Sequence, residues 1–202
     1  MSKRQSTAAI ILLGGEGQRF RPEKGLFEVD GQPIIQRIIE AIHPLVGQII
    51  GVGAVAKLPE GLDLPIVSDE VAGCGPLGGI YTGLRRMSAP HCFVVAWDMP
   101  FVHPGLVTYQ LSLADEAEAV VPRQGEQVEA LHAVYAQSCL PIIEEHLTAG
   151  DYKVANLFSR LRVRYVEAEE IGRFGPAERL FFNVNTPQDW EEAQRLASEG
   201  GE

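Results

Sequence analysis

A glycine-rich segment with three cations follows the first apolar run of the chain. Residues 8–13 (AAIILL) read as a strand buried on both faces, and residues 14–24 (GGEGQRFRPEK) follow it. Glycines let a backbone approach a ligand closely and direct N–H groups at it, and Arg19, Arg21 and Lys24 lie within six residues. The segment is therefore a candidate polyphosphate cradle. An ordinary glycine-rich turn with solvated basic residues is the alternative interpretation.

Two common phosphate-binding motifs are absent from this segment. GxxxxGK[ST] does not occur, and the third glycine position of G-x-G-x-x-G falls on Phe20. A P-loop NTPase and an NAD-type oxidoreductase are thereby disfavoured.

A carboxylate follows the clearest of the later strands. Residues 91–97 (HCFVVAW) are strongly apolar, Asp98 comes next, and Pro100 stops the strand. Mg²⁺ is usually held by one or two carboxylates together with substrate phosphates. The helix expected from Pro104 begins too far away for Asp98 to cap it, so we interpret Asp98 as a metal ligand.

Three more polar residues lie where extended segments end. Asp69 follows an apolar stretch at 64–67, and the period-2 spacing of Asn183 and Asn185 places both on one face of an extended segment. The alternatives are turn chemistry for Asp69, and turn or cap chemistry before Thr186 for the two asparagines.

The order of elements predicts how these residues are positioned. Strands and helices alternate along most of the chain, which indicates an open, largely parallel sheet with helices on both faces. Ligands of such sheets bind beyond the carboxyl ends of the strands. The strands at 119–122 and 131–135 are too close in sequence for a crossover helix, so an antiparallel strand is expected there. Strands are also expected at 48–52 and 163–166, and helices at 33–46, 77–87, 104–113, 139–147, 153–161 and from Thr186 onward.

Composition excludes several classes of protein. The 202 residues carry a formal net charge of −10, which argues against a general nucleic-acid binder. Three widely spaced cysteines do not form a disulfide framework, which favours a reducing, cytoplasmic location. No signal peptide or membrane span is expected, and the last few residues should be frayed.

Five segments resemble the molybdenum cofactor guanylyltransferases, a family of nucleotidyltransferases. LLGGEGQRF with KGLFEVDGQPIIQRI resembles the N-terminal signature of that family. Four later segments resemble its other motifs, namely Asp69 with GCGPLGGIYTGL (73–84), VVAWDMPFV (94–102), EALHA (129–133) and FFNVNTPQDW (181–190). The matches occur in order and span nearly the whole chain.

The resemblance implies a Rossmann-like nucleotidyltransferase fold, of α/β class, with three αβα layers and a mostly parallel mixed sheet. Residues 1–202 would form a single domain, with nucleotide-binding residues in about 1–100 and molybdopterin-binding residues in about 101–202. The implied reaction transfers GMP from GTP to the terminal phosphate of molybdopterin and releases pyrophosphate, with Mg²⁺ as cofactor. Transient contact with molybdenum cofactor biosynthesis proteins and molybdo-enzymes is also implied.

The resemblance also implies roles for individual residues. Lys24, Asp98 and Arg19 would be catalytic, with Asp98 binding Mg²⁺ and Asn183 and Asn185 facing molybdopterin. The GTP-binding residues would be Leu12, Leu13, Gly14, Gly15, Lys24, Asp69 and Asp98.

The loop before Lys24 departs from the family pattern. It is one residue shorter than the usual form, and Glu23 replaces an aspartate. The Gly14-Gly15 pair resembles the guanylyl branch rather than the cytidylyl branch, which favours GTP. A cytidylyltransferase or another small-molecule nucleotidyltransferase of the same fold remains an alternative, and a non-catalytic carrier of molybdopterin nucleotides is an alternative of another class.

Overall fold

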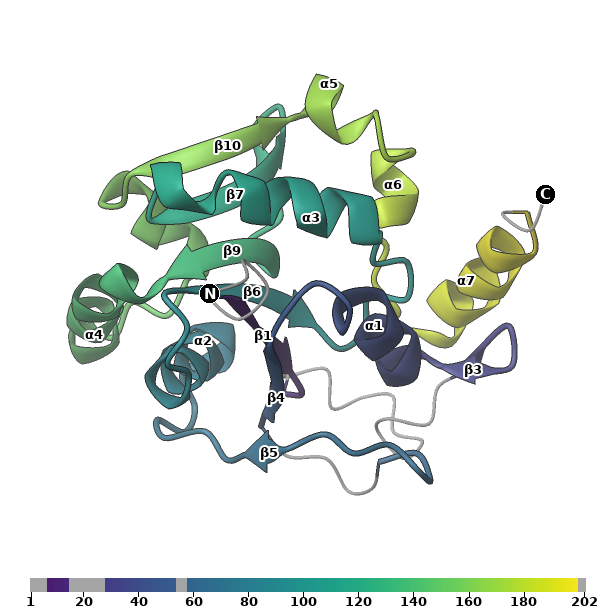
Figure 1. Cartoon of the computed structure of the whole chain (residues 1–202), viewed down its shortest axis with the longest axis horizontal. Helices are drawn as coiled ribbons and strands as arrows, with labels where there is room; N and C mark the ends of the chain where they lie inside the picture. The colour runs from purple at the N-terminus through teal and green to yellow at the C-terminus, as the bar shows by residue number, and fades with distance from the viewer. Residues whose placement is uncertain (1–6, 15–27, 54–57, 200–202) are drawn as a thin grey trace.

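The computed structural model describes residues 7–14, 28–53 and 58–199. A mixed sheet runs through the middle of the molecule in the order β10-β7-β9-β6-β1-β4-β5, with β8 paired to β7 (Figure 1). The strands are β1 (Thr7–Leu12), β4 (Gln48–Val52), β5 (Ile66–Val67), β6 (His91–Ala96), β7 (Ala119–Gln124), β8 (Gln127–Val128), β9 (His132–Ala136) and β10 (Val163–Glu167). A separate hairpin joins β2 (Glu28–Val29) to β3 (Gln32–Pro33).

The helices are α1 (Ile34–Ile42), α2 (Gly75–Arg86), α3 (Pro104–Ser112), α4 (Leu140–Ala149), α5 (Ala168–Ile171), α6 (Ala177–Leu180) and α7 (Pro187–Glu199). Short 3₁₀ helices lie at Ala114–Glu116, Gln137–Cys139 and Val154–Ser159. Within the described residues, no helix is long and apolar enough to span a membrane.

Strand direction confirms the expected fold class. β4, β1 and β6 run parallel to one another, and β10 runs parallel to β7. β9 is antiparallel to both β6 and β7, as predicted from the short spacing at 119–135. β5 and β10 form the two outer edges of the sheet.

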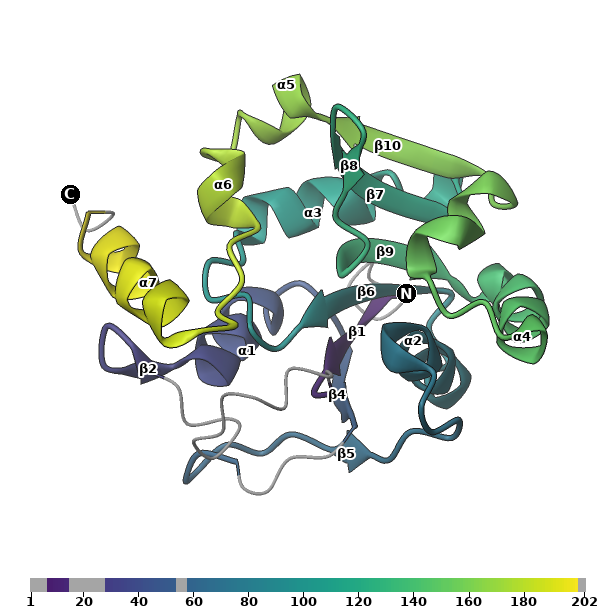
Figure 2. The ribbon, with the colours of Figure 1, turned by 180° about the vertical axis from the view of Figure 1, so that it is seen from behind.

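Alternation of side chains along the strands builds two cores. In β1, Ala9 and Ile11 face the core beneath α1 and α3, whereas Ala8 and Ile10 face the core beneath α2 and α4. The two groups of helices accordingly cover opposite faces of the sheet (Figures 1 and 2). The result is the three-layer arrangement that the alternating pattern predicts.

Two predicted helices differ in extent or type. The helix expected at 33–46 ends at Ile42. His43 still has helical backbone geometry, but Pro44 has no backbone N–H with which to continue the hydrogen bonding of the helix. The segment expected as a helix at 153–161 is the 3₁₀ helix Val154–Ser159. Its buried residues Val154, Leu157 and Phe158 recur at spacings that both kinds of helix share.

Candidate active site

The first residues after four neighbouring strands meet at one edge of the sheet. Leu13 N–H donates to the carbonyl oxygen of Val52 at 2.8 Å, and Gly53 N–H donates to that of Val67 at 2.9 Å. Trp97 N–H donates to the carbonyl oxygen of Leu12 at 3.1 Å. These bonds extend the sheet beyond its last formal pairs and hold the backbones after β1, β4, β5 and β6 side by side. This is the position at which open α/β sheets bind ligands.

The backbone of Leu12, Leu13 and Gly14 passes very close to the end of β4. Gly53 has φ +121°, and a Cβ at this residue would lie 3.0 Å from the backbone nitrogen of Gly14. Only glycine fits this conformation and this approach. Leu12 and Leu13 are buried, whereas Gly14 is exposed. The chain therefore presents accessible backbone at Gly14, above a packed support.

Asp69 lies between this backbone and helix α2. A Cβ at Gly14 would lie 4.0 Å from Asp69 Oδ2, and a Cβ at Gly79 would lie 3.6 Å from Asp69 Oδ1. The same Cβ at Gly79 would approach Leu12 Cδ2 to 2.8 Å, so the glycine allows α2 to pack tightly against β1. Burial raises the pKa of Asp69. The structure thus brings together Leu12, Gly14 and Asp69, three of the predicted nucleotide-binding residues.

Asp98 is a mostly buried carboxylate just beyond the end of β6. Its Oδ1 atom is buried and has no hydrogen-bond partner. Burial raises the pKa of Asp98 to about 6, against the opposing effect of a backbone hydrogen bond. An unpartnered buried carboxylate oxygen fits a cation ligand, because the cation would supply the interaction that the protein omits.

A cation at Asp98 would take its other ligands from water and substrate rather than from a cluster of protein side chains. The described residues contain no group of three or more His, Cys, Asp or Glu side chains arranged to hold a metal ion. Mg²⁺ commonly takes one carboxylate and completes its shell with water and substrate phosphates. The donor set at Asp98 therefore fits a magnesium ion that arrives with a nucleotide better than a permanent structural metal.

The segment with the two asparagines lies directly against Asp98. Val184 N–H donates to the carbonyl oxygen of Asp98 at 2.9 Å. Asn183 Nδ2 donates to the carbonyl oxygen of Phe181 at 2.8 Å, so its amide also has a role in the local turn. Asn185 is exposed, and its backbone N–H donates to Asp189 Oδ2 at 3.0 Å. Both asparagines thus flank the residue that contacts the predicted metal ligand.

Thr186 caps the last helix, which begins where it was expected. Thr186 Oγ1 accepts a hydrogen bond from Asp189 N–H at 3.1 Å, and Asp189 Oδ2 accepts one from Thr186 N–H at 2.8 Å. This reciprocal pair fixes the start of α7 immediately after Asn185.

Three of the predicted residues, Gly15, Arg19 and Lys24, lie outside the described residues, as does Arg21. Their predicted contacts with the triphosphate remain predictions. The described chain reaches Gly14 on one side of this segment and Glu28 on the other.

The tight turn between β8 and β9 also lies at this edge, although no residue in it was assigned a role from the sequence. His132 N–H donates to the carbonyl oxygen of Glu129 at 3.1 Å, and Ala96 N–H donates to that of Leu131 at 3.0 Å, which places the turn next to the end of β6. Burial raises the pKa of Glu129, although a hydrogen bond from Gln127 opposes the shift. The sequence signal was the EALHA segment, which matched the family but carried no assigned role.

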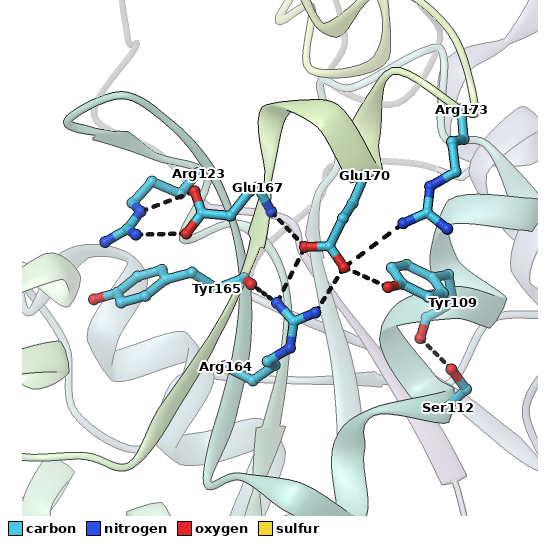
Figure 3. Close-up of polar contacts among 8 residues, drawn as sticks. All are labelled: Tyr109, Ser112, Arg123, Arg164, Tyr165, Glu167, Glu170 and Arg173. Carbon is cyan, nitrogen blue, oxygen red and sulfur yellow. Dashed lines mark hydrogen bonds and ion pairs between the residues drawn. The ribbon is translucent and has the colours of Figure 1, made fainter.

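A second polar cluster occupies the outer part of the sheet (Figure 3). Arg164 and Tyr109 both bind Glu170, and Arg123 binds Glu167. Arg123 also covers the ring of Tyr165, at 4.0 Å from the ring centroid. Each charged group drawn here faces an opposite charge in the same cluster, which is typical of a structural network rather than a binding site.

Known proteins share this fold. A model of the MobA-like NTP transferase domain matches residues 9–166. The crystal structure of 2-C-methyl-D-erythritol 4-phosphate cytidylyltransferase from Thermus thermophilus has a TM-score of 0.69 at 21% identity. The match covers 94% of this chain and 98% of that one. The fold is therefore that of the small-molecule nucleotidyltransferases.

The relatives in sequence are more specific. A probable molybdenum cofactor guanylyltransferase of Pelotomaculum thermopropionicum is 37% identical over 93% of this chain and 92% of its own. One of Methanosarcina mazei is 35% identical over 94% and 90%. The crystal structure of molybdopterin-guanine dinucleotide biosynthesis protein A from Archaeoglobus fulgidus has a TM-score of 0.81 at 29% identity, and the match covers 95% of this chain and 99% of that one. The chain belongs to the molybdenum cofactor guanylyltransferase family.

Proposed function

We propose that this protein transfers GMP from GTP to the terminal phosphate of molybdopterin and releases pyrophosphate, with residues 1–202 acting as one nucleotidyltransferase domain. The relatives named above support the reaction. The observation that carries the site is the hydrogen bond from Val184 to the backbone carbonyl of Asp98, because it joins the segment of the two asparagines to the predicted metal ligand.

In this proposal the nucleotide lies over the carboxyl ends of β1, β4 and β5. The backbone of Leu12, Leu13 and Gly14 binds the guanine and ribose, and Asp69 binds from the α2 side. Gly15, Arg19 and Lys24 bind the triphosphate, where Lys24 follows the charge that moves to the departing pyrophosphate. Asn183 and Asn185 hold molybdopterin on the opposite side of Asp98.

Asp98 would hold Mg²⁺, which neutralises phosphate charge when it is bound. The molybdopterin phosphate is already an anionic nucleophile, so the reaction needs no general base and no covalent enzyme intermediate. The contribution of the protein is to align the two substrates in line and to stabilise charge with fixed donors.

The test is to supply the purified protein with molybdopterin, Mg²⁺ and each nucleoside triphosphate in turn, and to measure pyrophosphate. We expect release with GTP that requires molybdopterin and is lost when Mg²⁺ is chelated. Turnover with CTP but not GTP would contradict the guanylyl assignment in favour of a cytidylyltransferase. Tight nucleotide binding without turnover would indicate a carrier.

A further inference from the structure

Helix α7 makes three hydrogen bonds to the β2–β3 hairpin through two side chains. Trp190 Nε1 and Gln194 Nε2 both donate to the carbonyl oxygen of Glu28, at 2.8 and 2.9 Å. Gln194 Oε1 accepts from the N–H of Asp30 at 2.9 Å. The two residues are four positions apart, so they lie on the same face of the helix. Figure 2 shows α7 lying along β2, far in sequence from it.

The packing of α7 makes these polar contacts prominent. Ala193 is the one residue of the helix that is fully buried, and Trp190 is 36% exposed. The part-buried ring of Trp190 packs on the protein, and its indole N–H also has a hydrogen-bond partner, as is usual for a tryptophan at such a position. The conformation of the hairpin is fixed by its own tight turn, because Asp30 and Gly31 have φ of 54° and 70°.

The two ends of this contact belong to different parts of the site. The hairpin begins at Glu28 and is bonded through Arg37 to Pro100, two residues after Asp98, and α7 begins two residues after Asn185. Val184, in turn, bonds to Asp98. A continuous set of bonds therefore runs from the hairpin through α7 to the asparagine segment and Asp98.

A second side chain fixes the same hairpin against Asp98. From α1, Arg37 Nη1 donates to the carbonyl oxygen of Val29 at 3.2 Å, and its Nε donates to that of Pro100 at 3.4 Å. Pro100 lies two residues after Asp98. The hairpin is thus held from two elements, by Arg37 of α1, which also bonds to Pro100, and by two side chains of α7.

We propose that Trp190 and Gln194 are positioning residues for guanylyl transfer, which hold α7 on the β2–β3 hairpin and so align the asparagine segment with Asp98. Neither residue contacts a substrate in this proposal. They act through the carbonyl oxygen of Glu28 and the N–H of Asp30. The inference rests on the proposed function and adds two residues to which no role was assigned from the sequence.

This role predicts a loss in kcat rather than in binding. Each substrate still meets its own binding residues when the bonds are removed, but their mutual alignment is relaxed, and misplacement by about 1 Å can cost on the order of 100-fold in rate. We expect Trp190→Phe combined with Gln194→Met to lower kcat at least tenfold, while the KM for GTP and that for molybdopterin each change less than threefold.

Graded variants separate alignment from simple folding damage. Trp190→Phe keeps an aromatic ring, although a smaller one, and removes the N–H donor. Gln194→Glu keeps the acceptor for Asp30 but removes the donor to Glu28. Both should give intermediate kcat values. Gln188→Met, at an exposed position of the same helix, is the matched control and should leave kcat unchanged. Thermal unfolding and far-UV circular dichroism of every variant report its folded fraction.

The outcomes distinguish this inference from the proposed function. Wild-type protein that transfers GMP, together with a double variant that is folded and within twofold of its kcat, would overturn the positioning role alone. A fall in kcat no larger than the loss of folded protein would overturn it as well. If wild type uses CTP instead of GTP, the proposed function fails, and the same kcat comparison with CTP still decides the role of Trp190 and Gln194.

Discussion

The N–H of Val184 donates a hydrogen bond to the carbonyl oxygen of Asp98 at 2.9 Å, which joins the C-terminal part of the chain to the end of a central strand. Because one residue on either side of Val184 is an asparagine, the bond fixes how far both amides lie from the predicted metal ligand. The two asparagines nevertheless differ. Asn183 bonds to the carbonyl oxygen of Phe181, whereas Asn185 is exposed.

This difference predicts unequal effects of removing each amide. Asn185→Ala should raise the KM for molybdopterin about tenfold, which corresponds to the loss of one hydrogen bond, and leave stability unchanged. Asn183→Ala should show the same kinetic change and also lower the free energy of unfolding by about 1 kcal/mol. Steady-state kinetics, calorimetric GTP binding and urea unfolding test both variants. Loss of GTP binding in either one would show that the two substrates are placed the wrong way round.

The buried carboxylate of Asp98 predicts a variant that is inactive yet more stable. Asp98→Asn should lower kcat at least 100-fold, since the ligand for Mg²⁺ is lost. In metal-free protein at pH 7.5 it should raise the free energy of unfolding by about 2–3 kcal/mol, because burial raises the folded-state pKa from 3.8 to about 6 and ionisation of Asp98 therefore opposes folding.

The sign of this effect fixes its pH dependence. Well below pH 3.8 the carboxyl is protonated in both folded and unfolded chains, so the advantage of the asparagine should vanish there, grow as pH rises from 3.8 to about 6, and be complete above that range. Urea unfolding of wild type and Asp98→Asn at pH 4, 5, 6 and 7.5 measures the difference. A constant difference across the series would argue against a raised pKa.

Gly53 predicts a steric effect on nucleotide binding. Gly53→Ala places a methyl group 3.0 Å from the backbone nitrogen of Gly14 and forces a conformation that side chains disfavour. We expect a loss of about 1–3 kcal/mol in stability and a GTP Kd raised at least fivefold, since the displaced backbone is the proposed guanine support. Gly61→Ala is the control, because Gly61 also has a positive φ (+81°) but has nothing within 4 Å of an added Cβ. It should lose stability without losing GTP affinity, and equal affinity losses in the two variants would remove the steric argument.

Glu170 predicts a purely structural effect at the outer part of the sheet. Burial acts to raise its pKa, but hydrogen bonds from Tyr109, the backbone of Glu167 and Arg164 outweigh it and lower the pKa to about 2. Because the folded-state pKa is depressed, this carboxylate stabilises the fold above the ordinary glutamate pKa, and the contribution is lost as pH falls from about 4.5 to 2.

Glu170→Gln should therefore lower the free energy of unfolding at pH 7 by about 1–2 kcal/mol, a figure reduced for solvent screening, and by less at pH 3. Tyr109→Phe removes one of the bonds and should cost less. Glu169→Gln, at the exposed neighbouring position, serves as the control. Guanylyl transfer by folded Glu170→Gln should match wild type, and a large fall in kcat would connect this network to catalysis.

Sequence patterns were sufficient where one element carries its own periodic signal. The apolar runs of β1 and β6 and the isoleucine stripe of α1 predicted the central sheet and one covering layer. The start of α7 at Thr186 could be predicted because the partner of the cap, Asp189, is only three residues away. Asp69 and Asp98 were predicted because they directly follow strands, and the sheet brings them to the same edge.

Other features depend on contacts that no local pattern encodes. β2 and β3 have two residues each, too few to show a period, and α5 and α6 span four residues each. The close approach of Gly53 to Gly14 appears only when β4 lies beside β1. Likewise, Trp190 and Gln194 are unremarkable residues on a helix until Glu28, more than 160 positions earlier in the chain, lies against them.

The two outer strands of the sheet bear on whether the protein aggregates at high concentration. Exposed backbone at a sheet edge can pair with another molecule and seed aggregation, and long apolar edges carry the greatest hazard. Here β5 has only two residues, and β10 carries Arg164 and Glu167, both held in ion pairs. The described edges are therefore poor templates for strand addition. The aggregation hazard lies instead with the apolar strands β1 and β6, which become accessible only when the centre of the sheet opens.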